Sequence, residues 1–239
     1  MFKGTTFEFN RIMLVRVVVA LALCGMFWVA SRRVSVVPGR GQGAAEMALD
    51  FVRVNIAEEI LGERGRKYLA MLTTIFFAVL AFNLSGAIPF LNMAGTSLVG
   101  MPIMLALWVF VMYLAAGVKA HHGVGGFLKS NLFPAGVPWF LYIMITPIEI
   151  LQVFIFRPAT LAIRLTANMI CGHLLLVLCF SATQFFFFEA TGVLKGMGVI
   201  SLAAGFAFTL FEVLVAALQA YIFALLAAVY IDLSTAKEH

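Results

Sequence analysis

Charged residues are scarce in this chain of 239 residues, and one long stretch has none. Lysine, arginine, aspartate and glutamate together make up 11% of the sequence, 63% of it is hydrophobic, and the mean hydropathy is +1.05. A soluble domain carries about 25% charged residues. The composition therefore excludes an ordinary soluble domain and predicts an all-α integral membrane protein.

Cysteine and ligand-binding motifs are also in short supply. The three cysteines, Cys24, Cys171 and Cys179, lie in apolar segments without a CxxC motif, which argues against a disulfide framework or a metal site. His121 and His122 would point in different directions on a helix, so they predict no metal site either. The sequence contains neither a GxxxxGKS/T phosphate loop nor a GxGxxG motif. We therefore expect no nucleotide-binding or hydrolytic site, no cofactor and no metal on this chain.

The first predicted span covers residues 12–31, which are uncharged from Val17 onward. A cleaved signal peptide is the alternative, but no small-x-small cleavage motif follows, and Arg32 and Arg33 are typical of a stop-transfer flank. Residues 42–66 then carry apolar and charged side chains on opposite faces at helical spacing, which is typical of an amphipathic helix in the membrane interface. A solvated helix that packs on a soluble partner would show the same pattern.

Residues 68–118 carry no charge and are long enough for two spans of about 20 residues each. We place these spans at 68–90 and 98–118. The turn between them is marked by Pro89, Asn92, Gly95 and Gly100. Asn83 and Ser85, within the first of the two spans, are typical of hydrogen bonds between packed helices, or of the wall of an aqueous channel.

The last two apolar regions cover residues 139–188 and 199–231 and are too long for ordinary spans. Pro147 and Pro158 are the expected kinks in the first region. As one helix, residues 199–231 would extend ~50 Å, whereas the hydrocarbon core of a bilayer is ~30 Å thick. The two regions are therefore predicted to form a long, strongly tilted hairpin, within a single polytopic membrane domain of about five spans.

The basic residues behind the net charge of +5 concentrate in the loops after the first and third predicted spans. They are not interleaved with exposed aromatic residues on a polar background, so nucleic acid is not expected as a partner. By the positive-inside rule these loops face the cytoplasm. Five crossings then predict a cytoplasmic C-terminus and an N-terminus outside.

Arginine, asparagine and histidine interrupt the otherwise apolar residues 156–176. A charged side chain at membrane depth is costly, so Arg164 is interpreted as functional. Asn168 follows it by four residues and Arg157 precedes it by seven, which places both near the Arg164 face of the helix, whereas His173 points about the opposite way. Because guanidinium stays protonated, Arg164 could stabilise a carboxylate or repel protons but could not pass them on.

The last apolar region carries Glu212 and Gln219 seven residues apart, on one face of the expected helix. Glu212 is the only acidic residue between Glu189 and Asp232, and a carboxylate there must be paired, hydrated or protonated. In the predicted hairpin, His173 and Glu212 could approach each other. They would form either a proton relay, because their reference pKa values flank mildly acidic pH, or a structural bond that locks the hairpin.

Several segments resemble subunit a of the F-type ATP synthase, the static half of a proton-driven rotary motor. The specific matches are RPATLAIRLTANM at residues 157–169 and FEVLVAALQAYIFALLAAVYI at residues 211–231, and VPGRGQGAAEMALDFV, NLSGAIP and GGF support them. The resemblance covers most of the chain. It implies a membrane stator whose partners are a c-ring of small hairpin subunits, peripheral-stalk b subunits, the rest of the complex, the lipid bilayer and protons.

The resemblance also implies roles for single residues. Arg164 matches the essential arginine that faces the acidic residue of the c-ring, with Asn168 and Gln219 as its polar neighbours. His173 and Glu212 match the two positions that line the inlet half-channel. In some bacterial members these two residue types are exchanged, and the order here resembles that of mitochondria and other bacteria.

Two positions agree less closely with the family pattern. Glu149 resembles the acid of the exit half-channel, although its distance along the chain from Arg164 differs slightly between members. Some relatives carry an acid in the NLSGAIP turn, where this chain has Gly86, which removes one candidate from the inlet. The implied path runs from outside past His173 and Glu212 to a c-ring carboxylate, and then to the cytoplasm near Glu149.

The residues alone also allow other interpretations. A proton-coupled secondary transporter would often show two related halves, and no internal repeat is apparent in this sequence. A structural scaffold would leave Arg164 and Glu212 at membrane depth unexplained. The function that is favoured is the proton-translocating subunit of a rotary ATP synthase, in a bacterial plasma membrane rather than an organelle inner membrane.

Overall fold

The computed structural model describes residues 11–32, 40–87, 100–121, 123–132, 142–192 and 194–235. Within these ranges all regular structure is helical, so the prediction of an all-α protein is confirmed. The longer helices are α1 (Arg11–Arg32), α2 (Arg40–Val52), α4 (Gly65–Ala87), α5 (Gly100–Ala120), α6 (Val124–Leu132), α7 (Tyr142–Leu151), α8 (Arg157–Phe188) and α9 (Leu194–Thr235). Short helical segments join them: η1 (Arg53–Glu58), α3 (Glu59–Leu61), η2 (Gly62–Arg64) and η4 (Gln152–Phe156).

Several of these helices are apolar enough to cross a membrane. Among the described residues, four runs reach the necessary length and hydropathy: Ala45–Gly86, Gly100–Ala120, Met144–Phe188 and Leu194–Thr235. Helix α1 adds a shorter apolar stretch, Met13–Val29. The protein is therefore an all-α integral membrane protein with four to five long apolar helices, as the composition predicts.

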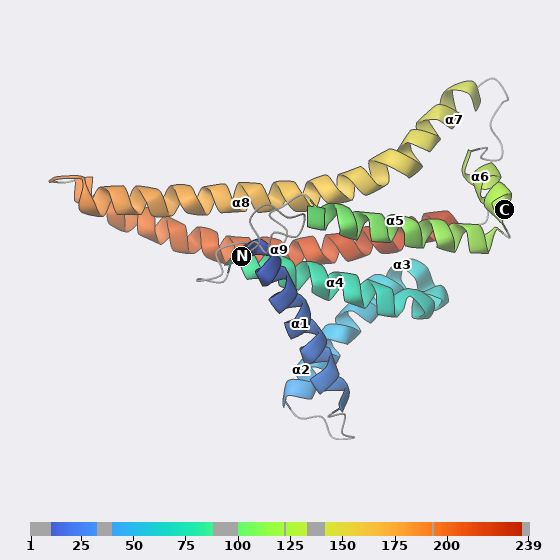
Figure 1. Ribbon diagram of the computed structural model, residues 1–239, viewed down its shortest axis with the longest axis horizontal. Coiled ribbons are helices and arrows are strands. Elements are labelled where there is room, and N and C mark those ends of the chain that lie inside the picture. The colour runs from blue at the N-terminus through green and yellow to red at the C-terminus, as the bar shows by residue number, and fades with distance from the viewer. Residues whose placement is uncertain are drawn as a thin grey trace, which may run out of the picture.

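The run Ala45–Gly86 changes direction partway along its length. Gly62 has a φ of +57°, a conformation that glycine adopts without strain. At this point the chain leaves α3 and returns along α4 (Figure 1). The residues predicted to form an interfacial helix, 42–66, lie almost entirely before this reversal, and their place at the bilayer surface stays a prediction.

The core lies where α4, α5 and the C-terminal half of α9 pack together. Val79 on α4, Val109 on α5 and Ala224 on α9 are fully buried there. Small side chains let membrane helices approach closely, and α9 presents a series of buried alanines to this core: Ala216, Ala220, Ala224, Ala227 and Ala228. Dense packing of α9 against the bundle therefore fixes one half of the long helix.

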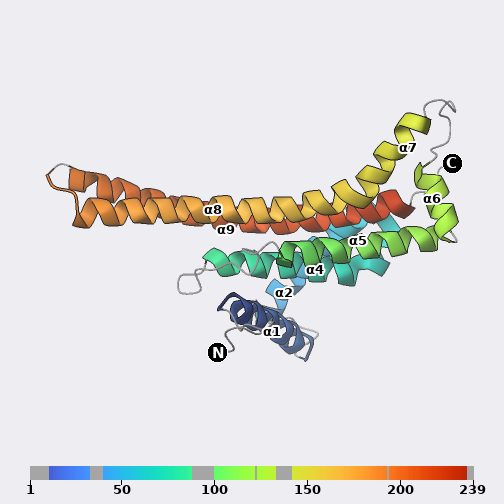
Figure 2. The same cartoon turned by 45° about the horizontal axis from the view of Figure 1, so that its top comes forward.

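Helices α8 and α9 form a long antiparallel pair that extends well beyond the rest of the molecule (Figures 1 and 2). Helix α9 has 42 residues, which corresponds to ~63 Å at 1.5 Å per residue. Before α8, the π-helical segment η4 separates it from α7, which contains Pro147 and bends away from the line of α8 (Figure 1). The strong tilt predicted for this hairpin in a bilayer stays a prediction.

Some predicted features fall outside the described residues. They are the turn marked by Pro89, Asn92 and Gly95, the second histidine of the adjacent pair, His122, and the arginine flank at Arg33.

Candidate functional site

A direct hydrogen bond joins the polar residues of α8 and α9. The Asn168 Nδ2 donates to Gln219 Oε1 over 2.9 Å. Gln219 is buried, and its own Nε2 has no hydrogen-bond partner among the described residues. Helical spacing placed Asn168 near the Arg164 face of one helix and Gln219 on the Glu212 face of the other, and the structure joins the two amides across the hairpin.

Glu212 lies about two turns before Gln219 on α9 and faces α8. Its side chain is 9% exposed, and neither carboxylate oxygen has a hydrogen-bond partner among the described residues. Gly172 on α8 makes this approach possible, because a Cβ atom there would lie 3.2 Å from Glu212 Oε1. An unpaired carboxylate at this depth is costly, so it needs water, a proton or a partner from outside the chain.

His173 follows Gly172 and carries a further titratable group in this part of the hairpin. The imidazole lies within electrostatic range of the Glu212 carboxylate, but the described residues include no hydrogen bond or salt bridge between them. Its Nδ1 atom is buried and unpaired. The sequence allowed either a relay or a structural bond, and the geometry contains two neighbouring titratable groups without a direct bond.

A small cavity connects this site to α4. It has a volume of about 20 Å³ and is lined by Asn83, Leu165, Asn168, Met169, Glu212, Val215, Ala216 and Gln219. A space of 10–15 Å³ accommodates one water if polar groups surround it. The lining supplies two carboxylate oxygens and three amide side chains, so the cavity has the size and the chemistry to hold a water beside Glu212.

Arg164 lies one turn before Asn168 and has a different environment. Its side chain is exposed, next to the exposed Ile163, and it has no hydrogen bond or ion pair with any other described residue. The structure thus places a permanent cation on an apolar outer face of α8, near the Asn168–Gln219 bond. Such a charge requires compensation from a group that the described residues do not supply.

Arg157 lies seven residues before Arg164 on the same face of the helix, but its side chain is buried. It is 7% exposed, and its guanidinium carbon lies 6.0 Å from the Tyr113 ring centroid and 5.5 Å from that of Tyr230. Aromatic faces attract a cation in this range. The Tyr113 hydroxyl donates to the Val153 carbonyl, which holds one ring in place. Arg157 is therefore a buried cation that two tyrosines from other helices stabilise.

Glu149 lies apart from the other predicted site residues. It belongs to α7, before the π-helical segment η4, and is half-buried. No hydrogen bond or ion pair links it to Arg157, Arg164 or any other described residue. The structure thus gathers Asn168, His173, Glu212 and Gln219 into one site, with Arg164 beside it and Glu149 elsewhere.

Comparison with known proteins identifies the family. A family model for the ATP synthase A chain matches residues 13–232. This chain belongs to the ATP synthase A chain family.

Individual relatives agree over almost the whole length. The chain is 49% identical to the ATP synthase subunit a of Rhodococcus erythropolis over 235 residues, which cover 98% of this chain and 85% of that protein. It is 37% identical to the ATP synthase subunit a of Pseudarthrobacter chlorophenolicus over 230 residues, 96% of this chain and 86% of the relative. The ATP synthase subunit a of Gluconacetobacter diazotrophicus is 36% identical over 235 residues, 95% of this chain and 89% of that one. The family match therefore covers almost the whole chain.

The structure gives three residues of this ATP synthase A chain a more specific role than the sequence did. Gly172 allows the close approach of Glu212, and a glycine directly before His173 was a signal that the sequence offered. Asn83 was interpreted as a packing residue or a channel wall, and it lines the cavity beside Glu212. Tyr113 carried no sequence signal for its contact with Arg157, since only the fold brings α5 and α8 together.

Proposed function

We propose that this chain is the proton-conducting stator subunit of a rotary F-type ATP synthase. It forms two offset half-channels that load and unload protons on the carboxylates of a c-ring, and so couples proton flow to ATP synthesis or hydrolysis. Peripheral-stalk b subunits and the rest of the complex hold it against the ring. It lies in a bacterial plasma membrane with the C-terminus in the cytoplasm and the N-terminus outside, as the basic loops favour.

The exposed Arg164 on an apolar face carries this proposal. A guanidinium keeps its charge under all relevant conditions, so it is a permanent electrostatic feature rather than a proton carrier. Exposed apolar side chains such as Ile163 and Ile170 lie near it on α8, as expected for a surface that faces lipid or another membrane subunit. A carboxylate that moves past this surface would be stabilised as the anion beside Arg164, and would release its proton there.

The neighbouring titratable groups support the inlet role. Glu212 and the Nδ1 atom of His173 are buried and unpaired among the described residues, and the two groups lie within electrostatic range of each other. A water in the cavity next to Glu212 would continue the proton path from Glu212 and His173 towards Asn83 on α4. Protons that arrive from outside pass along these groups to the c-ring, and Asn168 and Gln219 fix the two helices at the crossing.

The outlet lies on the other side of Arg164, towards α7. Glu149 is half-buried in that helix and receives the proton on its way to the cytoplasm. Because Arg164 separates the inlet from the outlet, a proton cannot move directly from one to the other and must travel on the ring. Each charge that crosses releases about 2.3 kcal/mol per 100 mV of membrane potential.

Inverted membrane vesicles that carry the complex test the proposal. We expect Arg164→Lys to abolish ATP-driven acidification, because an ammonium is a compact, strongly hydrated charge that loses its proton on desolvation, whereas guanidinium does not. Arg53→Lys is the matched control, since Arg53 is exposed on η1 and pairs with Glu58 at the surface. Pumping by this control should stay near the parent rate.

Assembly is checked in the same preparations by co-purification of the ring and the peripheral subunits. Loss of pumping in an assembled Arg164→Lys complex supports a role at the proton-transfer interface. Pumping near the parent rate in that complex would refute the central role of Arg164.

A further inference from the structure

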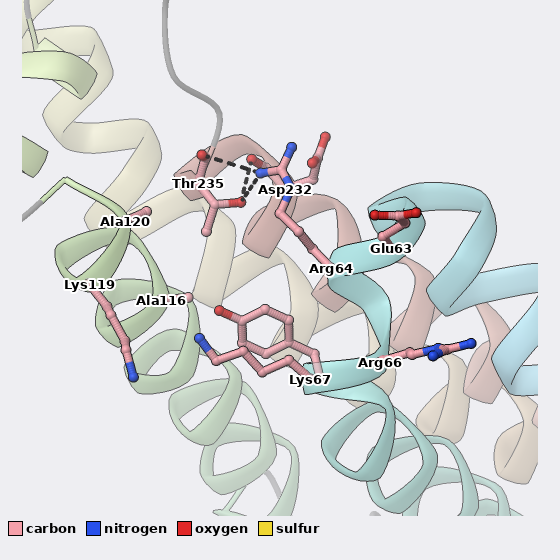
Figure 3. A pocket seen from close by; sticks show the side chains of 10 residues that line it. Glu63, Arg64, Arg66, Lys67, Ala116, Lys119, Ala120, Asp232 and Thr235 are labelled. Carbon is pink, nitrogen blue, oxygen red and sulfur yellow. Dashed lines mark hydrogen bonds between the residues drawn. The ribbon is translucent and has the colours of Figure 1, made fainter.

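A large basic pocket lies at the end of the molecule that is remote from the α8–α9 tip. It is formed where α4 begins and where α5 and α9 end (Figure 3). The open pocket has a volume of about 950 Å³, at the upper end of the 300–1,000 Å³ range of ligand sites. Its lining comprises Glu63, Arg64, Arg66, Lys67, Tyr68, Ala116, Lys119, Ala120, Asp232 and Thr235. The site is separate from the polar cluster around Glu212.

Charge in this pocket is unbalanced. Four of the lining side chains are basic and two are acidic, which leaves an excess of positive charge. The lining acids, Glu63 and Asp232, form no salt bridge with any described residue. In the view of Figure 3 they lie on one side of the pocket, and the ammonium groups of Lys67 and Lys119 lie on the other. The lysine side therefore presents positive charge that no described acid neutralises.

Three of the four basic side chains divide into a structural group, Arg64, and an available group, Lys67 and Lys119. Arg64 donates to both the Oγ1 and the carbonyl oxygen of Thr235, at 3.2 and 3.4 Å, and so caps the end of α9 (Figure 3). Lys67 only passes over the Tyr68 ring, with Nζ 5.5 Å from its centroid. Lys119, at the end of α5, is exposed and has no hydrogen bond or ion pair among the described residues. Two flexible ammonium groups from two helices thus remain free to bind an anion.

The depth of the pocket in the membrane indicates which kind of anion it would bind. Uncharged apolar segments begin after Lys67 on α4 and end before Lys119 on α5, so the pocket lies at the depth where lipid headgroups meet the hydrocarbon core. Lysine and tyrosine are typical of this level. Basic pockets between membrane helices suit phosphate-bearing headgroups of anionic lipids. Exposed apolar side chains on α5, below the pocket, are available to acyl chains of such a lipid.

We propose that this pocket binds the phosphodiester headgroup of an anionic phospholipid, with Lys67 and Lys119 as its ligands. The lipid joins the N-terminal end of α4 to the C-terminal end of α5, and so fills the gap beside the Arg64–Thr235 contact. This inference does not depend on the proton path, since none of the proposed channel residues lines the pocket.

Native mass spectrometry of the purified full-length chain tests the inference. The chain is released from detergent after incubation with dioleoyl phosphatidylglycerol or with zwitterionic dioleoyl phosphatidylcholine, and bound lipid is counted. We expect the parent to retain phosphatidylglycerol preferentially. Lys67→Gln and Lys119→Gln should each weaken its binding about five-fold, because a basic residue near the membrane surface contributes about 1 kcal/mol to the binding of anionic lipid.

Two further variants serve as controls. Lys195→Gln removes an equally exposed lysine from the beginning of α9, at the opposite tip of the molecule, and should bind as the parent does. The double variant Lys67→Arg/Lys119→Arg keeps both charges and should also bind. If the lysine-to-glutamine change at position 67 disturbs folding, as judged by thermal unfolding, Lys119→Gln at the exposed end of α5 still decides the question.

Three results would overturn the proposal. The first is equal retention of phosphatidylglycerol by the parent and the Lys119→Gln variant. The second is an equal loss in Lys195→Gln, which would indicate general charge attraction rather than a site. The third is displacement of the lipid by millimolar inorganic phosphate, which would make the pocket a site for a free anion.

Discussion

The two halves of α9 have opposite environments, although they form one uninterrupted helix of apolar sequence. In the inner half, Phe223 is 1% exposed and Ala224 is fully buried against the bundle. In the outer half, Phe206 is 64% and Leu210 is 74% exposed. Among the described residues, the far end of the outer half lies beside α8 alone, its partner in the hairpin, whereas α4, α5 and α8 surround the inner half (Figures 1 and 2).

This difference separates the residues that packing explains from those that it does not. In the inner bundle, Tyr113 donates to Val153, and the Arg157 guanidinium packs against two aromatic rings although its buried Nη1 has no hydrogen-bond partner among the described residues. Near the boundary between the halves, Glu212 is buried without a partner and Arg164 is exposed on an apolar face. The inner half thus stabilises the fold, and the outer half is complete only with lipid, water or another subunit.

The same substitution in both halves of α9 tests this comparison and should give the largest effect. We expect Phe223→Ala to lower the free energy of unfolding of the purified chain by about 3 kcal/mol, because it leaves a cavity in the core. Phe206→Ala removes an exposed ring and should cost less than about 0.5 kcal/mol. Titration with sodium dodecyl sulfate in mixed micelles, followed by circular dichroism, measures both.

Equal destabilisation by the two alanine variants would contradict the distinction between the halves. The comparison becomes sharper when both variants are studied in the assembled complex. If another subunit covers the outer half, Phe206→Ala should destabilise the complex more than it destabilises the chain alone.

Two arginines on α8 offer a second comparison, with an intermediate effect. Tyr230→Leu should destabilise the chain by about 2 kcal/mol, because the buried Arg157 loses one of its two aromatic faces. In an Arg157→Met background the same change should cost less, since no buried cation remains. Arg164→Met is the matched control, because its side chain is exposed and its loss should leave chain stability nearly unchanged. A Tyr230→Leu cost that is the same with and without Arg157 would show that the contact is packing alone.

The sequence was sufficient to predict the positions of the helices but not the directions in which they run. Long uncharged runs predicted the membrane helices at 68–90 and 98–118, and the structure has α4 and α5 there. The reversal at Gly62 and the π-helical segment η4 had no signal of their own, because a glycine or an apolar pentapeptide is compatible with a regular helix. Backbone direction at these points depends on packing against distant helices.

Helical spacing predicted which site residues share a helix face, but not whether each side chain is buried or exposed. Arg157 and Arg164 share a stripe by spacing, yet one is enclosed and the other exposed, because Tyr113 and Tyr230 come from helices that reach only the first of them. The pairing of Asn168 with Gln219 needed the register of the hairpin, which no local pattern specifies. Their roles in proton transfer stay proposals.

The hydrogen bond between Asn168 and Gln219 should give the smallest effect, because it lies at the boundary between the two halves. A double-mutant cycle with Asn168→Ala and Gln219→Ala measures it by the free energy of unfolding in micelles. Interhelical hydrogen bonds in a membrane protein average about 0.6 kcal/mol in such cycles, and we expect a coupling of this size. A coupling near zero would mean that α8 and α9 hold their register through small-residue contacts such as Gly172 with Glu212. Because the amides contribute so little to stability, a larger loss of proton pumping in the same variants would assign them to transfer rather than to the fold.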